Sequence, residues 1–565
     1  MATFSDLYQK SGGPLSKAIL TILNGIKYII DPELRALQIV DVAQNSSVEF
    51  LKAFWSLSEI QLMKQLPGLI CPKLEVREEI LVPDKAIILN KTSSNENVEI
   101  PAPTSHIPSA PVRCLLLSSV HRKGQVLKNG KSKMSNLEPK SRSLLFHCHG
   151  GGFVSQNPKS HEIYLRHWAH DLNVPILSVD YSLSPEAPFP RALEEVLLTY
   201  AWVLKNPDKL GWTGEIICFA GDSAGGNILM SVVLKTITLK IRQPDAVMCC
   251  YTPLVLDLVP SPSRLLCWVD PLLPLGFMIS CLNAYAGTTA TEDEYDVYDH
   301  QSGQRSRKIS SISEIIDSIL KDCTFAATNY VDDFIEKYGS EVDQKCQTED
   351  ISCNKEFTIY NFPHDIIFDI KTKCQKAANM GFNKISEIFM STTLYQRVIS
   401  PLLPSIEFPS KNKKQPKCDK NSSVFRKLQK LKLVSKNPFM SPLLASDDIL
   451  KQMPPIHFVS LNFDPCLDDS ITFAKRLKSL NRKVEIDFLD GLPHGFLNFL
   501  PFSQEAHDGS NLLLKKLHNQ LIFAIAQYTY LEYLYMLPNI KAKTHTTTTT
   551  TTTAAAAAAA ADKKL

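Results

Sequence analysis

Short apolar runs alternate with amphipathic segments along two stretches of the chain, residues 141–287 and 454–534. The apolar runs are nearly continuous, which is typical of strands buried on both faces of a parallel sheet. They predict strands over residues 143–150, 174–183, 215–223, 246–255, 454–464 and 483–492. Between them, apolar residues at helical spacing predict helices over residues 160–172, 190–206, 225–241, 468–480 and 511–534. This alternation indicates an α/β fold with a mostly parallel central sheet.

The remaining segments have other patterns. Residues 1 to about 90 carry apolar residues at helical spacing, whereas residues 91 to about 140 are polar and predict loops and short strands. Acidic and basic runs with little periodicity predict a partly disordered insertion, and threonine and alanine runs end the chain. We therefore expect a partial helical N-terminal domain (1–110), a first catalytic part (111–287), the insertion (288–435), a second catalytic part (436–540) and a low-complexity tail (541–565).

Composition adds limits to this picture. The 565 residues are 44% hydrophobic and 21% charged, with a net charge of +3, so bulk charge gives no argument for nucleic-acid binding. The first residues lack the apolar core of a signal peptide, and the fourteen cysteines form no CxxC pair. We therefore expect a cytosolic protein with reduced thiols. No apolar run is long enough to predict a transmembrane helix, so any lipid contact is expected to be peripheral.

A serine lies between two glycines where a predicted strand meets a predicted helix. The segment is "ICFAGDSAGGNILM", with Ser223 between Gly221 and Gly225. A G-x-S-x-G sequence in this context is typical of a strained elbow that exposes a nucleophile at a helix N-terminus, where the helix dipole favours developing negative charge. The other interpretation of the segment is an ordinary tight turn. The sequence by itself makes Ser223 a candidate nucleophile.

A run of three glycines follows an earlier predicted strand. The sequence "HGGGFV" begins at His149 and includes Gly150, Gly151 and Gly152. Such a loop lets backbone N–H groups approach a substrate closely and stabilise the oxyanion of a tetrahedral acyl intermediate. A simple glycine-rich turn is the alternative. The position of the loop before the elbow favours an oxyanion loop, because that is where an α/β hydrolase has one.

Two further candidates follow the last two predicted strands. Asp464 ends the run "IHFVSLNFD", and His494 lies in "DGLPHGF". A nucleophilic serine needs a base to take its proton and an acid to orient that base. The chain order Ser223, Asp464, His494 is that of the α/β-hydrolase fold, and parallel strands bring their carboxyl ends to one edge of the sheet. The sequence therefore predicts a catalytic triad.

Each of these motifs also has a purely structural interpretation. An aspartate after a strand commonly caps a helix, and we expect Asp468 or Asp469 to do so. His147 and His149 resemble a metal pair, but no cysteine or carboxylate is placed to complete a site. We therefore expect His147 to be a strand side chain and predict neither a metal nor a cofactor. It is the joint occurrence of the motifs, in order and at strand ends, that favours catalysis.

At these residues the sequence resembles the hormone-sensitive lipase family, within the HGGG and GDSAGG group of α/β hydrolases. The resemblance covers roughly residues 30–287 and 436–500. It is carried by the segments "IDPELRA", "FLKAFWSLSE", "SHEIYLRHWA", "DYSLSPEAPFPRALEE", "AGDSAGGN", "SPSRLL", "DPLLPL", "NPFMSPLLA" and "LPHGFL". By position it implies Ser223 as nucleophile, His494 as base, Asp464 as its orienting acid, and the N–H groups of Gly151, Gly152 and Ala224 as oxyanion donors.

The resemblance also implies a biological setting. Members of the family hydrolyse diacylglycerol best, and also triacylglycerol, monoacylglycerol, cholesteryl and retinyl esters. They work from the cytosol at the lipid-droplet surface, and cAMP-dependent kinase phosphorylates their insertion. Here the N-terminal domain is shorter than in the family, and no clear Arg-Arg-x-Ser site occurs. Ser310 in "RSRKISSIS" is the nearest kinase candidate, with a solvated basic run as the alternative.

Two other functions stay open. One is a short-chain carboxylesterase or deacetylase of the same group, which chain-length preference would distinguish. The other is a non-catalytic binding protein on the same scaffold, although such proteins tend to lose a triad residue. The apolar segment 265–282 is interpreted equally well as a wall of the acyl pocket or as a core helix. The oligomeric state is also open, with a homodimer as one option.

Overall fold

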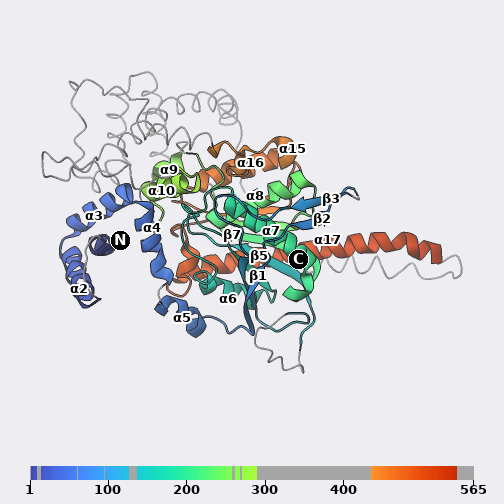
Figure 1. Ribbon diagram of the computed structural model, residues 1–565, viewed down its shortest axis with the longest axis horizontal. Coiled ribbons are helices and arrows are strands. Elements are labelled where there is room, and N and C mark those ends of the chain that lie inside the picture. Colours follow the sequence, from blue (N-terminus) through green and yellow to red (C-terminus); the bar gives the residue numbers. More distant parts are fainter. Residues whose placement is uncertain are drawn as a thin grey trace, which may run out of the picture.

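A computed structural model describes residues 2–8, 14–59, 61–94, 96–125, 137–257, 261–266, 270, 272–288 and 434–543 (Figure 1). An eight-stranded sheet with strand order β1-β4-β6-β5-β7-β8-β9-β10 forms its centre. The strands are β1 (Val76–Val82), β4 (Val112–Ser118), β5 (Ser141–Cys148), β6 (Ile176–Asp180), β7 (Trp212–Asp222), β8 (Ala246–Cys250), β9 (Ile456–Leu461) and β10 (Val484–Leu489). A separate hairpin consists of β2 (Ile87–Asn90) and β3 (Asn97–Ile100).

Neighbouring strands are parallel from β6 across to β10, and the β4 and β1 pairings are antiparallel. This confirms the predicted α/β fold with a mostly parallel sheet. The strand β8 pairs directly with β9 in the register Val247↔Ile456, although the predicted insertion separates them in the sequence. The second stretch of α/β pattern therefore continues the same sheet as the first.

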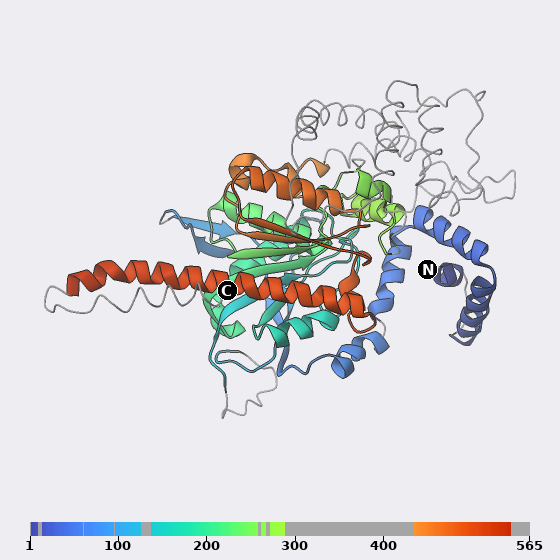
Figure 2. The same cartoon turned by 180° about the vertical axis from the view of Figure 1, so that it is seen from behind.

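Helices cover both faces of the sheet, which explains why its strands are continuously apolar. Alternate residues of β5 belong to opposite faces, with Leu144 and Phe146 in one buried cluster and Leu145 in the other. The first face is covered by α7 (Arg191–Lys205), α8 (Ala224–Leu239) and α16 (Leu467–Ser479), and the second by α6 (Glu162–Asp171) and α17 (Gln504–Lys543). Figure 2 shows α17 running across the sheet and beyond the body of the molecule.

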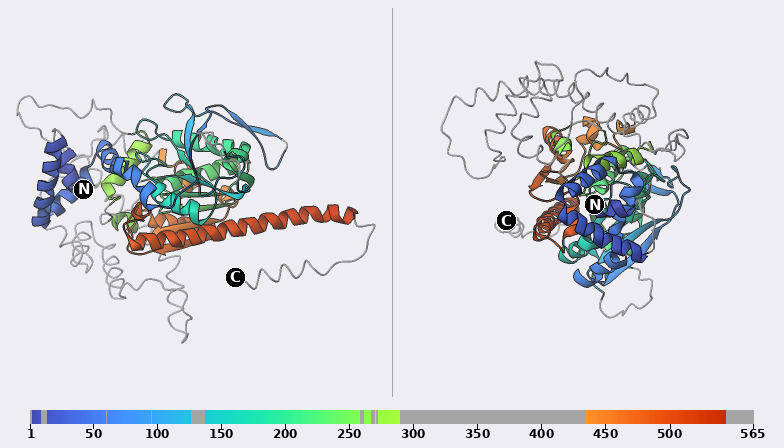
Figure 3. Two further views of the ribbon diagram at one scale, coloured as in Figure 1. Left: turned by 90° about the horizontal axis from the view of Figure 1, so that it is seen from below. Right: turned by 90° about the vertical axis from the view of Figure 1, so that its left-hand side faces the viewer.

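The N-terminal helices lie against one end of the α/β body (Figure 3). They are α1 (Ala2–Tyr8), α2 (Pro14–Ile30), α3 (Pro32–Asn45), α4 (Val48–Trp55) and α5 (Gln61–Ile70). The contact is aromatic, because Phe50, Phe54 and Trp55 of α4 surround Phe277 at ring-centre distances of 6.0 to 6.4 Å. Phe277 belongs to α10 (Leu275–Tyr285), and the short helices α9 (Pro262–Leu266) and α15 (Asp447–Leu450) flank the same side of the sheet.

Some predicted elements need correction. The helical prediction was wrong beyond Ile70, since residues 76–82 and 87–90 form strands. Residues 112–118, expected among loops and short strands, form the full sheet strand β4, which also pairs with β1. Nearly all of the insertion, and residues 544–565 of the tail, lie outside the described residues, and the five domain boundaries stay predictions. Among described helices, none combines the length and apolar character that a membrane crossing needs.

We predict that truncation on either face of β5 destabilises the protein. Leu144 and Leu145 are both fully buried but face opposite helical layers, so Leu144→Ala and Leu145→Ala should each cost about 2–5 kcal/mol in free energy of unfolding. Leu81 on the edge strand β1 is 57% exposed, and Leu81→Ala is the matched control, with a cost of about 0.5 kcal/mol or less. Urea unfolding midpoints measure all three. A β5 variant with the midpoint of the control would contradict the two-sided burial.

Candidate active site

Ser223 lies in a sharp elbow between β7 and α8. Its backbone has φ 51° and ψ −123°, a combination that non-glycine residues rarely adopt and that stores strain. The elbow packs directly on the end of β5, because a Cβ atom at Gly225 would collide with the carbonyl oxygens of Cys148 and His149. Ser223 also occupies the N-cap position of α8, so its hydroxyl lies at the N-terminus of a 16-residue helix. The predicted strand-turn-helix context is therefore present.

The structure brings Asp464 and His494 to Ser223. His494 Nε2 is 2.8 Å from Ser223 Oγ, and His494 Nδ1 is 2.6 Å from Asp464 Oδ2. Asp464 follows β9 and His494 follows β10, so both side chains come from loops at the carboxyl ends of parallel strands. All three side chains are buried. The arrangement is a continuous chain of hydrogen bonds from a carboxylate through an imidazole to a hydroxyl.

Several carboxylates set the proton affinity of His494. Burial by itself lowers the pKa of this imidazole, but the charge and hydrogen bond of Asp464, with the charges of Asp270 and Asp222, outweigh burial and raise the pKa above its usual range. Asp270 Oδ2 also accepts a hydrogen bond of 2.8 Å from the backbone N–H of His494. The ring of Tyr251 packs edge-on against His494 at 5.0 Å. The imidazole is therefore fixed in orientation, and its protonated form is stabilised.

The glycine loop passes beside the elbow. Gly151 and Gly152 have φ values of 107° and 61°, a region that favours glycine. A Cβ atom at Gly152 would lie 2.6 Å from Cys281 Sγ and 3.1 Å from the Trp55 ring, so the loop fits closely against α10 and α4. The N–H groups of Gly151, Gly152 and Ala224 donate to no other described residue. Among the described residues, these three backbone N–H groups near the elbow therefore have no hydrogen-bond acceptor.

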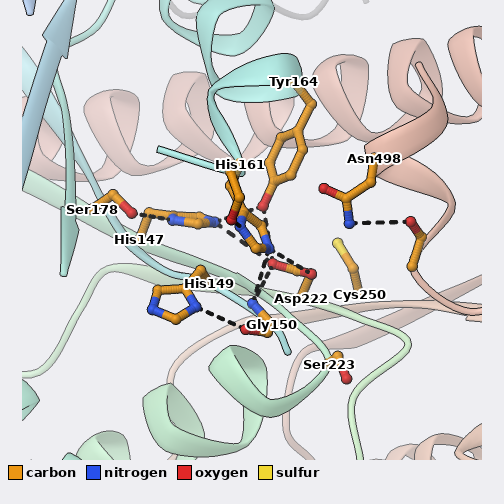
Figure 4. Close-up of polar contacts among 12 residues, drawn as sticks. His147, His149, Gly150, His161, Tyr164, Ser178, Asp222, Ser223, Cys250 and Asn498 are labelled. Carbon is orange, nitrogen blue, oxygen red and sulfur yellow. Dashed lines mark hydrogen bonds and ion pairs between the residues drawn. The ribbon is translucent and has the colours of Figure 1, made fainter. Parts of the chain in front are cut away.

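The histidines beside this loop are structural neighbours of it. His147 is buried in β5, with Nδ1 2.8 Å from Ser178 Oγ and Nε2 2.9 Å from the Tyr164 hydroxyl. His149 stacks on Tyr181 at 4.2 Å and its Nδ1 is 2.7 Å from the carbonyl oxygen of Gly150. Burial lowers the pKa of both rings to about 3, so both are neutral. Figure 4 shows each ring with its own hydrogen-bond partner, Ser178 for His147 and Gly150 for His149.

One group of described residues offers metal-type ligand atoms close together: Asp464, Cys466 and His494, within 4.8 Å of one another. The His494 and Asp464 ligand atoms already share a hydrogen bond, so a metal ion would have to displace it. The arrangement fits proton transfer along Asp464–His494–Ser223 better than it fits a structural or catalytic metal site, because a metal site needs ligand atoms that are available to bind the ion.

Three functional contacts were missed by sequence reasoning. Asp270 holds the backbone of His494, yet its only sequence signal is its place in the "DPLLPL" segment. The expected helix cap was wrong, because Cys466 is the N-cap of α16 and Asp469 instead accepts the N–H groups of Leu254 and Val255, both at 2.9 Å. Asp222 contacts the glycine loop from the elbow, which no local pattern reveals.

Two predicted features concern the region beyond the triad. Within residues 265–282, the described side chains of α10 are mostly buried, and Cys281 of this helix lies against Gly152, so α10 is a core helix that also adjoins the glycine loop. Ser310, the kinase candidate, lies outside the described residues and stays a prediction.

Comparison with known proteins gives two family matches. Residues 1–126 match the model of the hormone-sensitive lipase N-terminus, and residues 145–305 and 377–498 match that of the alpha/beta hydrolase fold. The chain is 34% identical to hormone-sensitive lipase of Mus musculus over 567 residues, covering 92% of this chain and 74% of the relative. For the Homo sapiens enzyme, the values are 33%, 92% and 52%. An esterase structure from Pyrobaculum calidifontis is 15% identical, with a TM-score of 0.47, covering 85% of this chain and 94% of that one.

The raised pKa of His494 predicts the pH dependence of Ser223 reactivity. Only the neutral imidazole can take the serine proton, so labelling by a fluorophosphonate should fall on the acid side with an apparent pKa above about 6.5. Asp270→Asn removes one of the charges that raise this pKa and should shift the acid limb to lower pH. The labelling rate constant, measured from pH 5 to 9, tests both statements. The exposed Asp171→Asn is the control, and an equal shift in that variant would contradict the assignment to Asp270.

Proposed function

Because this chain belongs to the hormone-sensitive lipase family of carboxylic ester hydrolases, we propose that it hydrolyses acyl esters of neutral lipids with Ser223 as the nucleophile. His494 is the general base and acid, and Asp464 orients it. The N–H groups of Gly151, Gly152 and Ala224 bind the oxyanion. The substrates are diacylglycerol, triacylglycerol, monoacylglycerol, cholesteryl esters and retinyl esters. The reaction needs no metal or cofactor.

In the acylation half, His494 Nε2 takes the proton of Ser223 as its Oγ attacks the ester carbonyl carbon. The carbonyl oxygen becomes an oxyanion and accepts hydrogen bonds from the three backbone N–H groups. Asp464 stabilises the resulting imidazolium without taking its proton. The intermediate collapses, the alcohol leaves with the proton from His494, and the acyl group stays on Ser223 as an ester.

In the deacylation half, water takes the place of the alcohol. His494 removes a proton from the water, whose oxygen attacks the acyl carbonyl carbon. The second oxyanion that forms accepts hydrogen bonds from the same backbone N–H groups. His494 then returns the proton to Ser223 Oγ, and the fatty acid leaves. Both halves use one histidine in alternating protonation states. This is the reason why its pKa matters to the rate.

The observation that carries the proposal is the hydrogen-bond chain, 2.8 Å from His494 to Ser223 and 2.6 Å from His494 to Asp464. It is supported by the strained φ of Ser223 at a helix N-terminus, and by the three uncommitted N–H groups beside it. Lipid specificity rests on the family. The same holds for action from the cytosol at a lipid-droplet surface and for control by a cAMP-dependent kinase at Ser310.

We predict that Ser223→Ala abolishes hydrolysis of both a soluble butyrate ester and emulsified diacylglycerol. Loss of the nucleophile should reduce kcat by about 10⁶-fold, to the assay background. Fatty-acid release measured by titration reports on both substrates. Ser231→Ala is the matched control, because Ser231 is buried in the same helix but its hydroxyl donates to the carbonyl oxygen of Asn227. This variant should keep the native rate.

The native protein discriminates between the functions. Hydrolysis of both substrates supports a lipase, whereas hydrolysis of the butyrate ester alone supports a short-chain esterase with the same triad. Undiminished activity of Ser223→Ala would overturn the proposed nucleophile. Absence of hydrolysis by the native protein on either substrate would support a binding protein on the hydrolase scaffold.

A further inference from the structure

The carboxylate of Asp222 lies between the elbow and the glycine loop. Asp222 is the last residue of β7 and directly precedes Ser223. Its Oδ1 accepts hydrogen bonds from the backbone N–H of Gly150 at 3.1 Å and from the Tyr164 hydroxyl at 3.0 Å (Figure 4). The side chain is buried, with 3% of the residue exposed. One carboxylate thus connects the residue before Ser223 with the residue before Gly151.

The contact leaves little room for movement. A Cβ atom at Gly150 would lie 2.5 Å from Asp222 Oδ2, so only glycine lets the carboxylate approach the loop this closely. On the other side of the carboxylate, His161 Nε2 is 3.6 Å from Oδ2 and 3.2 Å from the Gly150 nitrogen. The Gly150 N–H is therefore shared between two acceptors. Its donation to the carboxylate and to His161 fixes the direction of the peptide that leads into Gly151.

The neighbours of Asp222 keep it ionised. Burial alone raises the pKa of the carboxyl, but the imidazole of His161 and the hydrogen bond from the Tyr164 hydroxyl lower it well below its usual range. An ionised acceptor makes a stronger hydrogen bond to a backbone N–H than a neutral one does. Tyr164 in turn contacts His147, which contacts Ser178, so the donors around the carboxylate are themselves held in place.

We propose that Asp222 is a positioning residue that holds the glycine loop in register with Ser223, so that the N–H groups of Gly151 and Gly152 face the oxyanion. This inference rests on the proposed function, because it concerns the same reaction. No described hydrogen bond joins Asp222 to Ser223 Oγ or to the His494 ring, so apart from its effect on the pKa of His494 it acts through the Gly150 peptide. Without the hydrogen bond from the Gly150 N–H to Asp222, the glycine loop would lose its alignment with the elbow.

A positioning role for Asp222 predicts a selective effect on kcat, whereas a purely structural role would change only the stability of the fold. The oxyanion exists in the transition state and not in the bound ester, so misaligned N–H donors should lower kcat and leave KM nearly unchanged. A misplacement of about 1 Å can cost about 100-fold in rate. An inhibitor that forms an oxyanion adduct should lose affinity in parallel. A trifluoromethyl ketone forms such an adduct when Ser223 Oγ adds to its carbonyl carbon and the proton moves to His494.

The experiment compares Asp222→Ala, Asp222→Asn and the native protein on a soluble butyrate ester, with a butyl trifluoromethyl ketone as the probe. We expect kcat to fall about 30- to 100-fold in Asp222→Ala, with KM within about threefold. Asp222→Asn keeps an acceptor oxygen but not its charge, so it should recover most of the loss and stay about 3- to 10-fold below native. In both variants the Ki of the ketone should rise by the factor by which kcat/KM falls.

Asp245 provides matched controls. Its carboxylate also accepts a backbone N–H, that of Ile217 at 2.8 Å, but it lies beside the middle of β7, away from the glycine loop, and also pairs with Arg242 at 3.3 Å. Asp245→Ala and Asp245→Asn should therefore change stability without changing kcat or the ketone Ki. Thermal unfolding midpoints of all variants separate stability from catalysis.

Three results would overturn the inference: native kcat in Asp222→Asn, a loss carried by KM, or a ketone Ki that stays native while kcat falls. If Asp222→Ala does not fold, Asp222→Asn alone decides by the same three criteria. Ser223→Ala is assayed in parallel, so that failure of the proposed function is distinguishable. If Ser223→Ala is active, the proposed function itself is overturned. If Ser223→Ala is inactive but the Asp222 variants keep the native kcat and ketone Ki, only the positioning role is overturned.

Discussion

The close contact between the start of α8 and the end of β5 is the constraint on which the rest of the site depends. Gly225 brings the helix backbone against the carbonyl oxygens of Cys148 and His149, and no larger residue fits there. This contact places the N-terminus of α8 beside the end of β5, from which the glycine loop begins. Because Ser223 and the loop both lie at that junction, the proposed nucleophile and the proposed backbone donors are held in place by the same contact.

The parallel sheet supplies the remaining parts of the site. The carboxyl ends of β9 and β10 meet the carboxyl end of β7 along one edge, and the loops after them carry Asp464 and His494 to Ser223. Direct pairing of β8 with β9 lets the chain leave the sheet between them and return without displacing the triad. The buried pair of Arg264 and Asp469, 3.2 Å apart, holds the loop after β8 against α16 at this point of return.

The N-terminal helices also reach the site. Trp55 of α4 lies against Phe277 of α10 and near the Cα of Gly152, so the helical region contributes packing to the glycine loop. Asp270, which precedes α10, accepts a hydrogen bond from the backbone N–H of His494. The geometry of the proposed site is therefore supported by two separate parts of the chain, the N-terminal helices and the segment that includes Asp270 and α10. Loss of packing at either of them should disturb the surroundings of Ser223, because close-packed interiors transmit strain.

The sequence by itself determined the alternation of strands and helices, the elbow at Ser223 and the order of the triad, because these depend on local periodicity and on short motifs at strand ends. It misjudged residues 76–90, where antiparallel pairing of β1 with β4 and of β2 with β3 decided between helix and strand. Only the tertiary structure joined Asp222 to Gly150, Asp270 to His494 and Asp469 to the loop after β8. Those residues are 72, 224 and 215 positions apart, and no local pattern encodes which distant N–H group a buried carboxylate will meet.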